Sequence, residues 1–311
     1  MRLLFFGSGS FGEKALETLA LRGIPPAAVI SRPDRPAGRG GRARPTPIRG
    51  LAERLGLPVL TPDNPNAPEF AAGLAGLAPD LAIIVAYGHL IRRPLLDLPR
   101  LGFVNLHASL LPSYRGAAPV PWAILRGEAE SGVTVFRLDE RLDSGGVLAR
   151  AALPMDPGDT AGSYLEKLAP LGAELLFSTV IGLKAGTVGI EPQNETAASA
   201  APKFKKGDGR IDWSRPWLEI DRKVRAFQPW PLAFTFVPTR KGEARINVLG
   251  IARAGAAAGE AGPGRLLSAD PGRGLILMAG DGPIRIRLLQ PEGRRPMTDG
   301  EFLRGTRVIW E

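Results

Sequence analysis

Residues 81–88 read LAIIVAYG, a short apolar run that ends in a glycine. Apolar residues at nearly every position are typical of an interior strand of a parallel sheet, which is buried on both faces. Comparable runs and helical patterns alternate around it, the runs at 2–6, 27–31 and 102–107 and the helical patterns at 11–22, 48–55, 67–77 and 118–126. This alternation predicts an α/β fold with a doubly wound, mostly parallel, Rossmann-like sheet.

The last third of the chain has a different sequence pattern. A long helix is expected over 160–184, with Asp159 or Thr160 as its cap, and the residues after it show no clear period. Short β-rich runs then alternate with Gly and Pro turns at 232–237, 244–252, 274–279 and 283–289. They predict a small, OB-like β-barrel. We therefore predict domains at 1–186 and 205–311, joined by a linker at 187–204.

Composition excludes several classes of protein. The chain has 311 residues, of which 44% are hydrophobic, enough for two ordinary cores. Cysteine is absent, which excludes disulfides, thiol nucleophiles and cysteine-ligated metals. We see no apolar run near the length of about 18 residues that a membrane span needs, and the apolar N-terminus is too short for a signal peptide. We therefore expect no membrane partner and a cytoplasmic location.

The formal net charge of +9 is concentrated towards the C-terminus. Residues 1–202 hold 20 basic and 19 acidic side chains, whereas 203–311 hold 20 basic and 12 acidic ones. A basic domain attached to a nearly neutral one suggests that the basic domain binds a polyanion and the other carries the chemistry. Solubility is the alternative explanation, and charge alone leaves both open.

A glycine pattern near the N-terminus points to a different function. Gly7-Ser8-Gly9-Ser10-Phe11-Gly12 matches the G-x-G-x-x-G fingerprint of dinucleotide-binding proteins between a strand and a helix. Asp34 follows about 20 residues later, as the fingerprint requires, and Arg32 would suit the phosphate of NADP. One hypothesis is therefore an NAD(P)-dependent oxidoreductase. The other is a tight turn without a ligand, because short glycine patterns are common.

Two polar side chains fall at the end of the strand predicted over 102–107. Asn105 and His107 are two residues apart, so both point to the same face of the sheet, near the edge where ligands bind open α/β sheets. Asp143 follows another strand-like run and could orient the imidazole or take a proton through water. Acyl transfer to an amine requires a donor for the oxyanion and an acceptor for the proton. Taken singly, each residue also suits a purely structural role.

These residues belong to a pattern that resembles the signature of folate-dependent formyltransferases. The similarity covers essentially the whole length, and it is greatest with the members that formylate methionine attached to initiator tRNA. The blocks that carry it are, in chain order, Arg32–Gly40, Asn105–Pro119, Ser131–Thr134, Leu142–Gly145, Arg210–Trp213 and Arg225–Pro231. The resemblance implies a formyltransferase fold and, for residues 1–186 and 205–311, catalytic and tRNA-binding roles.

The resemblance also implies roles for single residues. The implied catalytic trio is Asn105, His107 and Asp143. The implied site for the donor, 10-formyltetrahydrofolate, comprises Ser109, Leu110, Leu111 and Pro112, with the backbone at Val85, Tyr87, Gly88 and Leu90. His89 either lines this cleft or is structural, and no metal is expected, since the formamide is already activated and a ligand set is missing. The chain departs from the family at three positions that remove no catalytic group, Ala108, Arg141 and Ser144.

Two basic groups suggest a nucleic-acid partner. Residues 31–50 combine six arginines with glycine and proline, which alone would indicate a solvated, mobile loop. The resemblance implies that this loop engages the acceptor end of initiator methionyl-tRNA, since Arg pairs with phosphates and stacks on bases. The residues predicted to contact tRNA are Arg35, Arg39, Arg42, Arg44, Lys203, Lys205 and Lys206, with Arg32, Arg49, Arg210, Arg222, Lys223 and Arg225 nearby. A nucleotide sugar or another small amine is the alternative acceptor. We expect a monomer.

Overall fold

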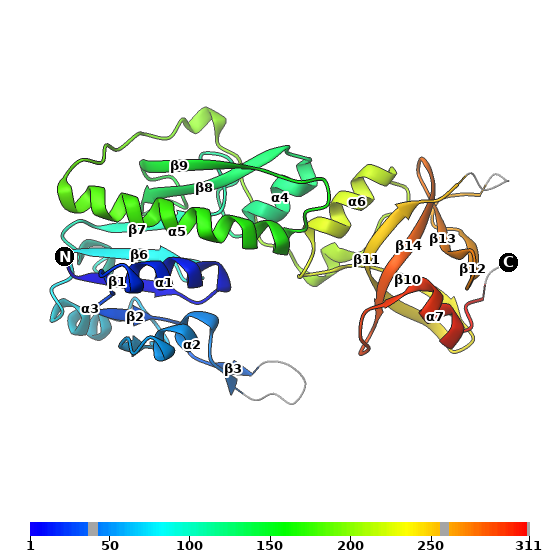
Figure 1. Cartoon of the computed structure of the whole chain (residues 1–311), viewed down its shortest axis with the longest axis horizontal. Coiled ribbons are helices and arrows are strands. Elements are labelled where there is room, and N and C mark those ends of the chain that lie inside the picture. Colours follow the sequence, from blue (N-terminus) through cyan, green and yellow to red (C-terminus); the bar gives the residue numbers. More distant parts are fainter. Residues whose placement is uncertain (37–42, 256–260, 310–311) are drawn as a thin grey trace. The chain divides into compact units, whose positions relative to one another are not determined.

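The computed structural model describes residues 1–36, 43–255 and 261–309 and divides into two compact units (Figure 1). Unit 1 comprises 1–119, 130–155 and 165–202. Unit 2 comprises 120–129, 156–164 and 203–311. Segments from the middle of the chain thus belong to both units, and the domain limits inferred from sequence stay a prediction.

Unit 1 is built on a seven-stranded sheet with the order β5-β2-β1-β6-β7-β8-β9. The first five strands in this order run parallel to one another. The sixth, β8, pairs antiparallel with both β7 and β9. The strands are β1 (Leu3–Gly7), β2 (Ala28–Ile30), β5 (Val59–Leu60), β6 (Leu81–Val85), β7 (Phe103–His107), β8 (Glu130–Arg137) and β9 (Val147–Pro154). The predicted α/β class with a mostly parallel sheet is confirmed.

Helices cover both faces of this sheet. In Figure 1, α1 and α5 lie across the front of the strands, and α3 packs on a core that includes Leu4, Phe6 and Ile84. Leu106 of β7 faces α5, because a Cβ on Gly172 would lie 3.0 Å from it. Asn105 and His107 therefore point away from α5. Unit 1 contains α1 (Glu13–Leu21), α2 (Pro47–Arg54), α3 (Pro68–Ala75) and most of α5 (Ala161–Ala185), with short 3₁₀ turns at Ser10–Gly12 and Leu95–Asp97, whereas all but the first residue of α4 (Pro119–Arg126) belongs to unit 2.

One helix, α5, is long and apolar enough to cross a membrane by length and composition alone. The expectation that no apolar run approaches this length was therefore wrong. Leu168, Leu176 and Val180 are buried in unit 1, although only 33% of the apolar window is buried. The helix also contains charged residues, among them Glu174, which pairs with Arg22.

The glycine turn after β1 packs tightly against the rest of unit 1. A Cβ on Gly7 would lie 2.8 Å from the Phe5 ring, and one on Gly12 would lie 3.2 Å from the buried Ile48. The Gly9 N–H donates to the oxygen of Ala86 at 3.2 Å. Close packing therefore accounts for the three glycines, which favours a turn without a ligand.

The arginine-rich stretch has regular secondary structure at both of its ends, where its composition alone would indicate a mobile loop. Two short strands, β3 (Arg35–Pro36) and β4 (Ala43–Arg44), pair antiparallel. Thr46 then caps α2, since its Oγ1 accepts from the Arg49 N–H at 3.1 Å. The positions between the two strands lie outside the described residues.

Unit 2 contains a curled antiparallel sheet with the order β10-β11-β14-β13-β12, and β15 pairs with β14 (Figure 1). Its core includes Ile246, Ile286 and Leu289, with Val224 from α6 and Phe302 from α7. The predicted OB-like class is confirmed, whereas sequence analysis missed both helices. The elements are α6 (Trp217–Ala226), β10 (Ala233–Thr239), β11 (Gly242–Arg253), β12 (Leu266–Asp270), β13 (Gly274–Ala279), β14 (Gly282–Pro291), β15 (Met297–Thr298) and α7 (Asp299–Gly305).

Candidate active site

His107 lies at the end of β7 and is held in one orientation. Its ring is buried and meets the edge of Phe136 at a centroid distance of 6.3 Å. Its Nε2 lies 2.9 Å from the main-chain oxygen of Tyr114. Because a carbonyl can only accept, Nε2 carries the proton and donates. The other ring nitrogen, Nδ1, faces Asp143.

Asp143 reaches the same place from the loop between β8 and β9. Its Oδ2 lies 3.9 Å from Nδ1 of His107 and accepts the main-chain N–H of Gly116 at 2.8 Å. Both side chains are buried. A separation of 3.9 Å is too long for a direct hydrogen bond but keeps the carboxylate within ion-pair distance of the imidazole. The structure thus brings together two residues that are far apart in the sequence.

Asn105 lies two positions before His107 on the same face of β7 and is half-buried. Its side chain has no hydrogen-bond partner among the residues that the structure describes. An amide in this state can donate to a bound oxygen. The three predicted residues therefore supply a donor, an imidazole and a carboxylate, and their catalytic roles stay a prediction.

The predicted folate segment after β7 is held by a buried hydroxyl. Thr134 Oγ1 donates to the oxygen of Ser109 at 2.7 Å and accepts the Leu111 N–H at 3.0 Å. Ser109 is fully buried, and Leu111 packs with Phe136. These two side chains shape the segment from inside, while Leu110 and Pro112 are partly exposed. Folate contact by this segment stays a prediction.

The second predicted folate segment follows β6. Val85 and Tyr87 are buried, whereas Leu90 is exposed and its oxygen accepts from Asn66 at 2.9 Å. Burial raises the pKa of the Tyr87 hydroxyl to about 12, so this group stays protonated near neutral pH. The His89 ring lies 5.5 Å from the Tyr87 ring. Pairing of a pterin with the backbone of Val85, Tyr87, Gly88 and Leu90 also stays a prediction.

A hollow of about 560 Å³ lies between the start of β7 and the loop after β8. Its apolar lining comes from Leu96, Phe103 and Leu138, and its charged lining includes Asp139 and Arg141. None of the catalytic trio lines it, but Asp139–Arg141 directly precedes the segment that carries Asp143. None of the residues predicted to bind folate lines this hollow, and the position of the folate cleft stays a prediction.

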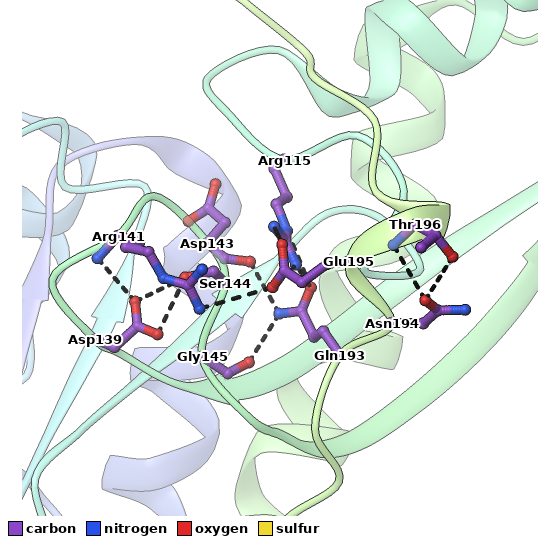
Figure 2. Close-up of polar contacts among 10 residues, drawn as sticks. All are labelled: Arg115, Asp139, Arg141, Asp143, Ser144, Gly145, Gln193, Asn194, Glu195 and Thr196. Atoms are coloured by element: carbon purple, nitrogen blue, oxygen red, sulfur yellow. Dashed lines mark hydrogen bonds and ion pairs between the residues drawn. The ribbon is translucent and has the colours of Figure 1, made fainter.

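Two of the three departures from the family take part in polar contacts around Asp143 (Figure 2). Ser144 donates through Oγ to both carboxylate oxygens of Asp139, at 2.9 and 3.0 Å. Arg141 forms an exposed ion pair with Glu195 at 3.7 Å. Ala108, the third departure, is buried. Ser144 and Arg141 therefore belong to the scaffold of the Asp143 loop.

The basic residues predicted to contact tRNA are only partly described. Arg44, Lys203, Lys205 and Lys206 are exposed, as a phosphate contact requires. Arg35 belongs to β3, but its side chain is not described. Arg39 and Arg42 lie outside the described residues. Their contact with tRNA stays a prediction.

Three neighbouring cations are bound within the protein. Arg49 pairs with Asp34 and Glu53, and its pKa is raised mainly by the hydrogen bond to Glu53. Lys223 donates to the oxygen of Arg210 at 2.6 Å, and burial lowers its pKa. Arg225 pairs with Asp221 at 2.8 Å. These three side chains have structural partners and are weaker candidates for phosphate contact than the exposed lysines.

Metal chemistry has no ready-made site in the part of the chain that the structure covers. Among residues 1–36, 43–255 and 261–309, no group of three His, Asp or Glu side chains could hold a metal ion.

Two family models match the chain, Formyl transferase over residues 1–180 and Formyl transferase, C-terminal domain, over residues 203–307. The chain belongs to the formyl transferase family, which replaces the oxidoreductase hypothesis. Within it, the chain is similar along its whole length to methionyl-tRNA formyltransferases. That of Desulfotalea psychrophila is 40% identical over 99% of this chain and 94% of its own. That of Geotalea uraniireducens is 41% identical over 99% and 96%.

Solved structures share the fold. HypX from Aquifex aeolicus in complex with tetrahydrofolic acid superposes with a TM-score of 0.64 and 20% identity. The match covers 97% of this chain and 47% of HypX, so this chain spans about half of that protein. WlaRD, a sugar 3N-formyl transferase solved with dTDP and 5-N-formyl-THF, has a TM-score of 0.65 and 17% identity over 95% of this chain and 99% of its own. At these identities the likeness concerns the fold alone.

Proposed function

We propose that this chain transfers a formyl group from 10-formyltetrahydrofolate to the amino group of methionine on initiator methionyl-tRNA, for translation initiation. The observation that carries the proposal is the approach of His107 and Asp143 to 3.9 Å at the end of β7, on the face that also bears Asn105. This arrangement occurs in a chain that is about 40% identical, end to end, to methionyl-tRNA formyltransferases.

Each residue of the trio has a part in the proposed reaction. The amine attacks the formyl carbon, and the formyl oxygen becomes an oxyanion, which the Asn105 amide stabilises, joined by His107 when its ring is protonated and Nδ1 also carries a proton. Asp143 accepts the proton that the amine nitrogen loses, through a water that His107 helps to hold. When the bond from carbon to N10 of the folate breaks, N10 takes up a proton and the formylated amine is released.

The donor site is proposed at the end of β7 and after β6, where the resemblance places folate. Ser109 and Leu111 are buried and shape the segment that follows His107, while Leu110 and Pro112 are partly exposed. A donor bound to this segment would have its formyl group close to His107, which lies just before it in the chain. The hollow of about 560 Å³ lies at the start of β7 and is not assigned to the donor.

The basic groups support a tRNA acceptor. Unit 2 has exposed Lys203, Lys205 and Lys206, and it presents the half-exposed Phe236 ring with the Arg210 guanidinium 5.8 Å from its centre. Exposed cations next to an aromatic face are typical of nucleic-acid contacts, because phosphates pair with the cations and bases stack on the ring. A small amine would need neither feature.

The decisive test is to incubate the protein with 10-formyltetrahydrofolate and charged initiator tRNA and to look for formylmethionine. We expect transfer to the charged tRNA and none to a dTDP-amino sugar. Affinity for tRNA should fall steeply as salt is raised, whereas affinity for folate should change little. Formylation of the sugar, or a tRNA affinity that is insensitive to salt, would support the small-amine alternative.

Replacement of Arg39 and Arg42 by Ala tests the predicted tRNA contact of the arginine-rich residues 31–50. The variant should bind tRNA up to about tenfold more weakly. Its affinity for tRNA should also fall less steeply with salt, because each lost phosphate contact removes some counterion release. Folate affinity should stay at the wild-type value. Equal losses of affinity for both substrates would count against a tRNA contact by residues 31–50.

We also propose that the protein is cytoplasmic and monomeric. Light scattering of the free protein measures the oligomeric state.

A further inference from the structure

We infer that Gln193 is a positioning residue for Asp143, 50 positions away in the chain. The inference rests on the proposed formyl transfer, because it concerns the carboxylate assigned to that reaction. Gln193 itself does not touch the reacting groups; it holds the main chain that carries Asp143. The two residues belong to the same unit, so the contact is internal to unit 1.

The Gln193 amide is buried and bonded at both ends (Figure 2). Its Nε2 donates to the main-chain oxygens of Asp143 at 2.9 Å and Gly145 at 2.8 Å. Its Oε1 accepts from Nε and Nη2 of Arg115, at 3.1 and 2.8 Å. Because carbonyl groups only accept and a guanidinium only donates, these partners determine which end of the amide is nitrogen. One side chain thus holds the loop on both sides of Ser144.

The loop has a conformation that needs such support. Asp143 has a φ of +49°, in the left-handed region that residues with a side chain seldom adopt. Gly145 lies so close to Arg137 that a Cβ would fall 1.7 Å from the Arg137 oxygen. Ser144 is tied to Asp139 on the same side. The end of β8 therefore holds one side of the loop and Gln193 holds the other, and together they direct the Asp143 side chain.

Arg115 links Gln193 to the second support of Asp143. Its guanidinium pairs with Glu195 at 2.9 Å, and hydrogen bonding to Arg115 holds the pKa of that carboxyl below its usual range. The next residue, Gly116, donates its N–H to Oδ2 of Asp143 at 2.8 Å. The same side chain therefore orients the Gln193 amide and anchors the turn that binds the carboxylate.

Main-chain pairing fixes where Gln193 lies. Glu191 and Val147, the first residue of β9, exchange both main-chain hydrogen bonds at 2.8 Å. Arg115 and Ala200 form a second bridge nine positions further on. The main chain of the segment is therefore bound to unit 1 on both sides of Gln193, and the hydrogen bonds of the amide itself then hold the side chain against the Asp143 loop.

Gln193→Glu is the most informative variant, because Glu has the same shape, keeps an acceptor for Arg115 and, when ionised, cannot donate to the two carbonyl groups. The kcat for formyl transfer should fall about 10- to 100-fold, since misplacement of a reacting group by about 1 Å can lower the rate about a hundredfold. The KM for charged tRNA should change less than about twofold, since tRNA contacts are elsewhere.

Asn194→Ala is the matched control. Asn194 is the neighbour of Gln193 and is exposed, and its side-chain hydrogen bonds within the described residues go to Thr196 (Figure 2). Its loss removes a local cap of the 3₁₀ turn Glu195–Ala197 without altering the Asp143 loop. The kcat of this variant should match that of the wild type.

A double-mutant cycle separates positioning from a general structural role. In an Asp143→Ala background, adding Gln193→Glu should leave the single-turnover rate within about twofold, because nothing remains to be positioned. A further full loss in that background, or a wild-type kcat in Gln193→Glu, overturns the inference. If Gln193→Glu does not fold by circular dichroism, Arg115→Lys should lower kcat in the same direction, and an unchanged kcat there overturns it too. A wild-type protein that transfers no formyl group refutes the proposed function instead.

Discussion

Two buried carboxylates, one in each unit, have opposite surroundings. Asp299 in unit 2 accepts four hydrogen bonds: Nε and Nη2 of Arg285 at 2.7 and 3.2 Å, and the N–H groups of Leu275 and Gly300 at 3.2 and 2.9 Å. Asp143 in unit 1 accepts one, from Gly116, although it is about as buried. Its other neighbour is the His107 imidazole at 3.9 Å.

The difference separates a structural carboxylate from a chemical one. Burying a charge is unfavourable unless hydrogen bonds replace water, and at Asp299 they do so completely. At Asp143 the supporting bonds go instead to the main chain, through Gln193, and the carboxylate keeps room for a partner. Burial alone therefore does not mark a reacting group; unfilled hydrogen-bonding capacity beside an imidazole does.

The largest expected effect concerns the chemical carboxylate and its imidazole. His107→Ala and Asp143→Ala should each lower kcat for formyl transfer by about 10²- to 10⁴-fold, the usual contribution of positioned acid–base groups. Circular dichroism should show an unchanged fold. A rate close to that of the wild type in either variant would mean that its residue has no catalytic role, and the contrast between Asp143 and Asp299 would no longer hold.

The next effect concerns the structural carboxylate. Asp299→Asn should lower the free energy of unfolding of unit 2 by about 2 to 3 kcal/mol, because charged hydrogen bonds to Arg285 are lost at a buried site. The four tryptophans that the structure describes, Trp122, Trp213, Trp217 and Trp230, belong to unit 2, so their fluorescence in urea reports on this unit. The kcat at 25 °C should remain within about twofold of the wild type. A large loss of kcat with full stability would reverse the assignment.

The smallest effect is the pH dependence of that stability. Burial raises the pKa of Asp299, but hydrogen bonds from Arg285, Leu275 and Gly300 outweigh it and hold the pKa below the usual value. Because the pKa of Asp299 is lower in the folded than in the unfolded protein, its ionisation stabilises the fold at pH values above the unfolded-state pKa of about 4. This stabilisation is lost as the pH falls through the folded-state pKa. From pH 7 to pH 3, wild-type unit 2 should therefore lose more stability than Asp299→Asn. Parallel curves for the two proteins would contradict this.

Local patterns account for what could be predicted in the fold. The buried strand at 81–85 follows directly from a run of apolar residues, because burial on both faces leaves no polar positions. The helix at 161–185 follows from its length and its cap, since Thr160 accepts the Ser163 N–H. Helices α6 and α7 were missed because each is short and lies among β-rich runs. The β3–β4 pair was missed because two-residue strands have no period to detect.

The sequence by itself determined the fold class and the identity of the three polar residues, since strand periodicity puts Asn105 and His107 on one face and a motif singles out Asp143. Only the tertiary structure brought Asp143 to 3.9 Å from His107 and placed Gln193 against its main chain. Loop conformation and contacts over 36 and 50 positions depend on packing in three dimensions, and side chains of the same type, such as Asp143 and Asp299, acquire different roles from the donors that packing places around them.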